Sequence, residues 1–121
     1  METQKFSADN AGLGQALAFL DEVCPNPRVS VIFDEIGSNI VRCSGATAFD
    51  ISVDRTSEGV VIVVSDDGKE FDPTKFDHPD ISLPAEQREI GGLGIMMVRK
   101  MSKSFTYERT GDGRNVVRIV V

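Results

Sequence analysis

The sequence predicts an α+β fold: a two-layer α/β sandwich with a mixed, mostly antiparallel sheet and helices on one face. Two observations support this prediction. Two segments with helical spacing open the chain, and two pairs of short strands follow, each pair joined by a tight turn. Short turns join antiparallel strands only, and hairpins combined with helices indicate a sandwich rather than a doubly wound parallel sheet.

Composition and charge limit the class of protein. The chain has 121 residues, with 13 Lys and Arg against 19 Asp and Glu, so its formal charge is −6. This length fits one domain over residues 1–121 that buries a core without disulfides. An acidic chain with no Trp and no basic cluster predicts no nucleic-acid partner. The lack of an apolar run of about 18 residues predicts no membrane partner. Two cysteines and a polar N-terminal segment favour reduced thiols and a cytoplasmic location.

The first two predicted elements are helices. Apolar residues at helical spacing indicate one helix around residues 13–20, and the run Pro25-Asn26-Pro27 ends it. Apolar side chains at intervals of three and four indicate a second, strongly amphipathic helix over residues 29–43, which Ser44-Gly45 stops.

The pattern then changes to that of strands. Residues 49–54 alternate between apolar and polar, which is typical of a half-buried strand. Residues 60–64 form a continuous apolar run, which is typical of a strand covered on both faces. The short turn between them, ending at Glu58-Gly59, predicts an antiparallel pair.

The second half of the chain repeats this combination after a long loop. Residues 66–91 carry glycines, prolines and acidic residues with little periodicity, and such a stretch in a small domain is usually functional. A short helix is predicted over residues 93–101. Alternating residues 104–108 and 117–121 flank a turn of Thr110-Gly111-Asp112-Gly113 and predict a second hairpin.

Glu35 and Asn39 form the first candidate functional pair. They are four residues apart on the second predicted helix and therefore share one face, beside its apolar stripe. A carboxylate at such a boundary can accept a proton or orient a nucleophile, and an amide oxygen is a ligand suited to Mg²⁺. On spacing alone, a solvated glutamate at a polar helix edge is the simpler interpretation.

Two further motifs follow. Asp66-Asp67-Gly68 ends the most apolar strand, where a carboxylate can accept a hydrogen bond from an exocyclic amine such as that of adenine. Gly91-Gly92-Leu93-Gly94 precedes a helix, where backbone amides and the helix dipole favour phosphate. Taken alone, a strand-ending turn explains the first motif more simply, and flexible loop glycines explain the second about equally well. The single histidine, His78, has no accompanying catalytic or metal motif and is interpreted as structural.

Together, these motifs resemble the nucleotide-binding pattern of the GHKL (Bergerat-fold) ATPase superfamily, which carries a histidine-kinase-like ATPase domain. The pattern consists of residues 35–39, 66–73 and 88–95. Within the superfamily, the chain is most similar to the anti-sigma-factor serine/threonine protein kinases. Residues 107–109 and 113–117 also resemble the C-terminal strand pair of that group, and the resemblance spans roughly residues 28–121.

The resemblance implies a role for each matching residue. Glu35 matches the catalytic carboxylate, and Asn39 matches the residue that holds Mg²⁺ between the phosphates. Arg42 falls where relatives often carry a basic residue near the phosphates. Asp66 matches the adenine-binding carboxylate, and Gly68 matches the glycine beneath the base.

The third motif carries the remaining implied ATP-binding residues. Gly92 and Gly94 match phosphate-facing glycines at the hinge of an ATP lid, and Leu93 and Ile95 lie in the same segment. Arg88 falls where the kinase group carries a lid arginine that approaches the terminal phosphate.

The resemblance also implies an activity and partners. Members of the group bind ATP with Mg²⁺ and phosphorylate a Ser or Thr of a STAS-domain anti-sigma-factor antagonist. Many sequester a sigma factor, and an opposing metal-dependent phosphatase reverses the reaction. The ATP lid is expected at about residues 72–91, and a homodimer is expected. The alternative is a nucleotide-dependent binding module of the same fold that regulates a partner without phosphotransfer.

Overall fold

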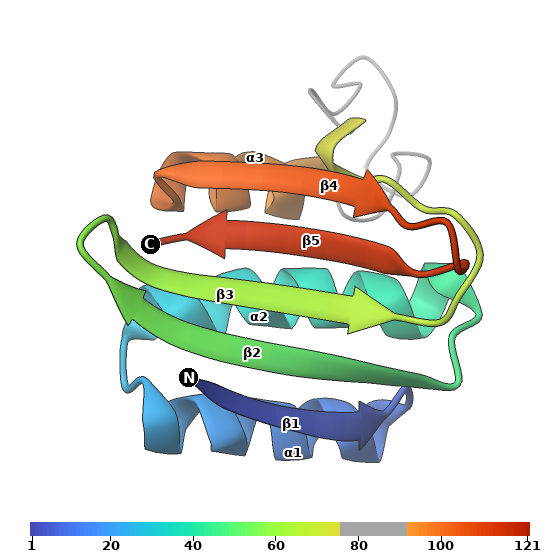
Figure 1. The fold of residues 1–121 in the computed structure, drawn as a ribbon, viewed down its shortest axis with the longest axis horizontal. Coiled ribbons are helices and arrows are strands. Elements are labelled where there is room, and N and C mark those ends of the chain that lie inside the picture. The colour runs from blue at the N-terminus through green and yellow to red at the C-terminus, as the bar shows by residue number, and fades with distance from the viewer. Residues whose placement is uncertain (76–91) are drawn as a thin grey trace.

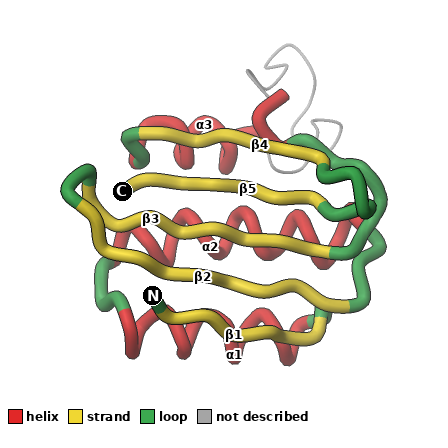
Figure 2. Tube along the Cα trace, in the orientation of Figure 1, coloured by secondary structure: helices red, strands yellow, loops and turns green. Residues whose placement is uncertain are grey.

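The sheet and its helices form two layers. The computed structural model describes residues 1–75 and 92–121. Within these residues, five strands form one sheet in the order β1-β2-β3-β5-β4, and three α-helices cover one of its faces (Figures 1 and 2). The elements are β1 (Glu2–Ser7), α1 (Asn10–Val23), α2 (Pro27–Asn39), a π-helical turn (Ile40–Ser44), β2 (Ala48–Thr56), β3 (Gly59–Asp66), a short 3₁₀ turn (Pro73–Lys75), α3 (Gly92–Met101), β4 (Ser104–Arg109) and β5 (Asn115–Val120).

The sandwich predicted from the sequence is confirmed. A mostly antiparallel sheet was expected, and every pairing among the described strands is antiparallel. The two predicted hairpins are β2–β3 and β4–β5, and the pairing of β3 with β5 joins them. The register places Ile51, Val64, Val117 and Tyr107 in one row across the sheet, on the face that the helices cover.

Strand β1 is not predicted by the sequence patterns. It pairs with β2 at the edge of the sheet, and Phe6 is its single buried residue. The ring of Phe6 lies with its centroid 5.6 Å from that of Phe49 and 5.7 Å from that of Phe19. An edge strand that buries one side chain has no alternating apolar pattern to detect.

Capping side chains fix the starts of the first two helices. Asp9 accepts a hydrogen bond of 2.7 Å from the amide of Gly12 at the start of α1. Asn26 accepts one of 3.0 Å from the amide of Arg28 at the start of α2, directly before the proline that opens that helix. Both caps satisfy backbone donors that the helices themselves leave unpaired.

The second helix changes character near its end. The sequence predicts a helix to residue 43, but the regular α-helix ends at Asn39 and continues as a π-helical turn over Ile40–Ser44. Gly45 then ends the turn in the left-handed conformation, at φ 66°, which glycine adopts without steric cost. Single π-helical turns inside or after α-helices occur frequently at functional sites.

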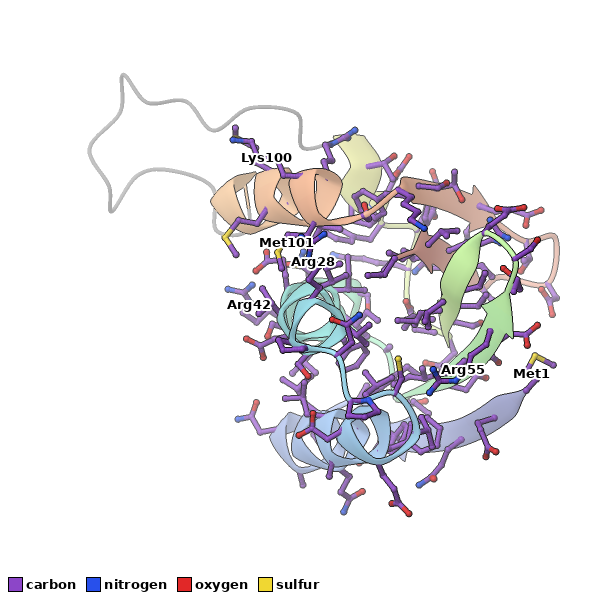
Figure 3. The ribbon with its side chains drawn as sticks, turned by 90° about the vertical axis from the view of Figure 1, so that its left-hand side faces the viewer. Met1, Arg28, Arg42, Arg55, Lys100 and Met101 are labelled. Carbon is purple, nitrogen blue, oxygen red and sulfur yellow. The ribbon has the colours of Figure 1, made fainter. Side chains whose placement is uncertain are left out.

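The hydrophobic core lies between the two layers. Side chains of the helices and of the inner sheet face meet there, as the side view in Figure 3 shows. Its largest fully buried members are Phe33, Phe49, Leu20, Ile32, Ile36, Ile51, Ile62, Ile95, Ile119, Val29, Val64 and Val98. Burial of this apolar surface holds the helices on the sheet and so fixes where the ends of α2, α3, β3 and β5 meet.

Candidate functional site

Buried polar side chains gather at one end of the molecule. Four polar residues of the described chain are buried: Asn39, Ser44, Asp66 and Asn115. They lie at the end of α2, in the π-helical turn, at the end of β3 and at the start of β5, which come together at the right-hand side of Figure 1. Because buried polar groups need partners, this concentration marks a candidate site.

A narrow cavity of about 10 Å³ lies among these residues. Its walls are formed by Ile36, Asn39, Ile40, Asp66, Phe71, Pro73, Asn115 and Val117. The walls are mostly apolar, with a carboxylate and two amides among them, which is the usual lining of a small-molecule pocket.

Asp66 is the carboxylate of this cavity. Its Oδ1 accepts hydrogen bonds from the Gly68 amide at 2.8 Å and from Nδ2 of Asn115 at 3.0 Å. Within the described residues, no hydrogen bond reaches its second oxygen, Oδ2. One oxygen of Asp66 is therefore held by the protein, and the other is open to a donor from a ligand.

Gly68 allows a close approach between the loop after β3 and the π-helical turn. A Cβ at this position would lie 2.5 Å from the carbonyl oxygen of Ser44 and 2.6 Å from its Oγ. The next residue, Lys69, donates its amide to the same carbonyl at 2.8 Å. Only glycine fits this contact, which seats the loop beside Asp66.

Asn39 lies across the cavity and contacts Arg42. The Arg42 guanidinium donates to Oδ1 of Asn39 at 3.0 Å and to the carbonyl of Ser38 at 3.3 Å. Arg42 itself is exposed and lies on the helix side of the molecule, away from the sheet (Figure 3). The amide oxygen of Asn39 is therefore already turned toward a positive charge.

Glu35 lies one turn before Asn39 and contacts the start of α3. A Cβ added to Gly94 would overlap the Glu35 carboxylate, so the backbone of α3 and this carboxylate are in direct contact. Burial raises the pKa of the Glu35 carboxyl above its usual value, and the positive charge of Arg42 opposes that rise. A half-buried carboxylate with a raised pKa is a better general base than a solvated one.

The donor set fits a magnesium ion together with a phosphate ligand. Two buried side-chain atoms of the described chain lack a hydrogen-bond partner, Oε1 of Glu35 and Nδ2 of Asn39. Both lie on adjacent turns of α2, and the Asn39 side chain also acts as a hydrogen-bond donor that lowers the pKa of the Glu35 carboxyl, so the two atoms can pair with each other or with a ligand. Carboxylate and amide oxygens are the protein ligands that Mg²⁺ prefers.

A second, more open depression lies on the solvent side of Glu35. It is lined by Asn10, Leu13, Glu35, Ser38, Val41 and Arg42. Glu35 and Arg42 lie near the polar end of α2. They also line this depression, which is open to solvent between α1 and α2. The sequence gives no local motif for this depression, because it forms only when the two helices pack.

The remaining predicted site residues lie in α3 or outside the described residues. Gly92 begins α3, and Ile95 is buried in the hydrophobic core, so that its side chain supports the helix. The side chain of Leu93, together with Arg88 and the predicted lid beyond Lys75, lies outside the described residues.

Asn115 lies in the segment 113–117 that resembles the family's strand pair, but the sequence analysis assigns it no role in the site. It sits in β5 on the same face as Val117 and Ile119, and it is 2% exposed. An asparagine at an inward position of an otherwise apolar alternating strand is the sequence feature that indicates it.

Fold and site together define a small α+β domain with a mostly apolar pocket, containing a buried carboxylate and two amides, between its helices and its sheet. A family model of the histidine kinase-like ATPase domain matches residues 3–121. The chain therefore belongs to the histidine kinase-like ATPase domain family. A search among curated proteins gave no match.

Family membership bears on two sequence predictions. It confirms the resemblance to the GHKL-type ATPases, and it implies ATP binding. The kinase group within that superfamily is a finer assignment than the family model makes. Separately, none of the helices in the described ranges combines the length and the apolar character needed to cross a bilayer.

Proposed function

We propose that this protein is an ATP-dependent serine/threonine protein kinase that acts as an anti-sigma regulatory factor. The observation that carries the proposal is the contact between the Glu35 carboxylate and Gly94 at the start of α3. It sets a half-buried base beside backbone amides at a helix N-terminus, where phosphate is favoured. A base next to a phosphate site is what transfer to a hydroxyl group requires.

Asp66 and Asn39 would hold the two ends of the nucleotide. The free Oδ2 of Asp66 would accept the exocyclic amine of adenine, with Ile36, Ile40 and Val117 of the cavity wall against the base. The α3 residues Gly92 and Gly94 would face the phosphates with their backbone amides. Arg88 is proposed for the terminal phosphate on the resemblance alone.

Asn39 and Arg42 would share the charge at the phosphates. Mg²⁺, when bound, would neutralise charge on the phosphate oxygens. Its proposed ligand is Oδ1 of Asn39, which now accepts from Arg42. The amide oxygen has a second lone pair that could bind the metal, and the Arg42 guanidinium beside it would be within reach of a phosphate oxygen.

Glu35 would act as the base in the transfer. The hydroxyl oxygen of the acceptor bonds to the γ-phosphorus, the bond from that phosphorus to the β,γ-bridging oxygen breaks, and ADP leaves. The hydroxyl proton passes to the Glu35 carboxylate, whose raised pKa suits it to accept that proton.

The proposed partners rest on the resemblance to the anti-sigma kinases. The acceptor would be a Ser or Thr of a STAS-domain anti-sigma-factor antagonist, with an opposing metal-dependent phosphatase. A sigma factor and a second copy of this chain are further proposed partners. The open depression beside Glu35 offers a route by which an acceptor hydroxyl reaches the base.

The test is phosphotransfer from γ-labelled ATP to STAS-domain proteins of the same organism, with Mg²⁺ present. Glu35→Gln is expected to lower the transfer rate by about 100-fold or more while ATP affinity changes little, because it removes the base and keeps the shape. Glu22→Gln, at an exposed position of α1, is the matched control and is expected to behave as the unaltered protein.

The outcomes separate the proposed activity from its alternative. Acid-stable label on the acceptor, lost in Glu35→Gln, supports a serine/threonine kinase. ATP binding without label on any STAS-domain protein contradicts the kinase proposal and favours a nucleotide-dependent binding module. An unchanged rate in Glu35→Gln removes Glu35 from the role of base.

A further inference from the structure

The side chain of Asn115 forms hydrogen bonds with β3, with the loop after β3 and with β4. We propose that Asn115 is a positioning residue that determines base specificity: it fixes Asp66 so that the pocket accepts a 6-aminopurine and rejects a 6-oxopurine. This inference rests on the proposed ATP site and deepens it. It concerns a residue to which the sequence analysis assigns no role.

The orientation of the Asn115 amide is fixed by its partners. Nδ2 donates to Oδ1 of Asp66 at 3.0 Å and to the carbonyl of Lys69 at 2.7 Å. Oδ1 accepts from the Tyr107 hydroxyl at 2.6 Å, from Nη1 of Arg109 at 3.1 Å and from the Phe71 amide at 3.2 Å. The nitrogen faces two acceptors, and the oxygen faces the donors Arg109 and Phe71, so exchanging the two would break four of the five bonds; only the Tyr107 hydroxyl can also accept.

This network controls how Asp66 presents itself to a ligand. Asn115 and Gly68 both donate to Oδ1 of Asp66, which leaves Oδ2 as the acceptor for a ligand. A ligand that places an N–H group there donates a hydrogen bond to Oδ2 of Asp66. A ligand with a carbonyl oxygen there sets two acceptors against each other, and sites built in this way discriminate strongly.

Asn115 also separates Asp66 from a nearby cation. Arg109 donates to Oδ1 of Asn115 and, at 2.8 Å, to the carbonyl of Gly68. Its guanidinium therefore binds neutral oxygens on the far side of the amide. Without Asn115, Arg109 can turn to the carboxylate, and an ion pair there would occupy the oxygen that the base needs.

The same side chain shapes the rim of the pocket. Its bonds to Lys69 and Phe71 hold the backbone of residues 69–71 against β5. Phe71 and Pro73 line the cavity together with Asn115. Base specificity and the width of the pocket are thus set by one buried amide.

The test compares ATP with ITP, which differs from it at the 6-position of the purine. Affinities are measured by calorimetry for the unaltered protein, Asn115→Asp, Asn115→Ala and Tyr107→Phe. Asn115→Asp keeps the oxygen that Tyr107, Arg109 and Phe71 contact but loses the donor to Asp66. Tyr107→Phe removes one contact and keeps the amide orientation, so it is the matched control.

The unaltered protein is expected to bind ATP about 100-fold or more tightly than ITP. In both Asn115 variants, ATP affinity is expected to fall about tenfold or more, with ITP affinity changed less, so that the preference shrinks. Tyr107→Phe is expected to keep the preference within about threefold.

Four results would overturn the inference, and the first three leave the proposed function standing. An unaltered ATP/ITP preference in Asn115→Asp and Asn115→Ala would remove Asn115 from base selection and leave the proposed kinase standing. Equal binding of ATP and ITP by the unaltered protein would do the same. Failure of both variants to fold, judged by circular dichroism, would make Asn115 structural. No ATP binding by the unaltered protein would instead contradict the proposed function and the inference together.

Discussion

The Glu35 carboxylate occupies the space where a side chain on Gly94 would begin. This contact couples α2 to the start of α3, two helices that are more than fifty residues apart in the sequence. It explains why a glycine stands inside the first turn of α3, where alanine would be favoured by helix propensity. The glycine at position 94 therefore leaves the space that the carboxylate of the proposed base occupies.

Gly94→Ala is expected to displace the Glu35 carboxylate. Phosphotransfer should fall by about 100-fold, because small misplacements of a reacting group have effects of that size. Stability should change by less than about 1 kcal/mol, because the atoms that must move are the end of the flexible Glu35 side chain and alanine has the higher helix propensity. The measurements are transfer of labelled phosphate and urea unfolding.

Gly14→Ala is the matched control for that substitution. Gly14 lies inside α1, is exposed, and a Cβ there meets nothing within 4 Å. Alanine should therefore stabilise the protein by about 0.5–1 kcal/mol and leave activity unchanged. If Gly94→Ala is as stable as Gly14→Ala and fully active, the contact with Glu35 has no role.

Gly68→Ala should weaken nucleotide binding. The new Cβ would press on the Ser44 carbonyl, so the loop must move and the Gly68 amide leaves Oδ1 of Asp66. Loss of that bond should lower ATP affinity by about tenfold in calorimetry. Gly111→Ala, in an open turn with nothing near its Cβ, should bind ATP as the unaltered protein does.

How much of the site was predictable depends on the range of the interactions. Glu35, Asn39, Asp66 and Gly68 lie in short motifs, so their grouping follows from local spacing and the resemblance. Asn115 contacts Asp66 across 49 residues, and no local pattern relates the two.

The fold shows the same limit. The helices and the two hairpins follow from periodicity, which reports burial along each segment. Strand β1 buries only Phe6, and its position depends on pairing with β2, more than forty residues later. The π-helical turn after Asn39 brings the Ser44 carbonyl to the amide of Lys69 in the loop after β3, a tertiary contact without a local pattern.

Asp67 should make stability depend on pH in the acid range. Hydrogen bonds from Thr47 and Ala48 lower the pKa of this carboxyl from its usual 3.8 to about 2, with the Thr47 hydroxyl as the largest cause. The folded state therefore binds the proton less readily than the unfolded state. Its stabilising contribution is complete above pH 3.8 and is lost as the pH falls toward 2.

Asp67→Asn tests this contribution. The unaltered protein should exceed the variant in free energy of unfolding by about 0.5–1 kcal/mol at pH 6, a modest value because solvent screens an exposed carboxylate. The difference should shrink as the pH approaches 2. Thr47→Val, which removes the hydroxyl donor and keeps the backbone donors, should show a smaller pH dependence. A difference that stays constant between pH 6 and pH 2 would contradict the assignment to Asp67.

Phe6→Ala measures what the edge strand β1 contributes. Phe6 is 4% exposed and contacts the rings of Phe19 and Phe49, so its removal leaves a cavity between α1 and the sheet. The free energy of unfolding in urea should fall by about 3 kcal/mol, whereas Lys5→Ala, at an exposed position of the same strand, should change it by less than about 0.5 kcal/mol. ATP affinity of the folded Phe6→Ala protein should stay unchanged, because β1 and the start of β5 are separated by two strands. A loss of ATP affinity larger than the loss of folded protein would instead show that α1, which packs on β1, also supports the depression beside Glu35.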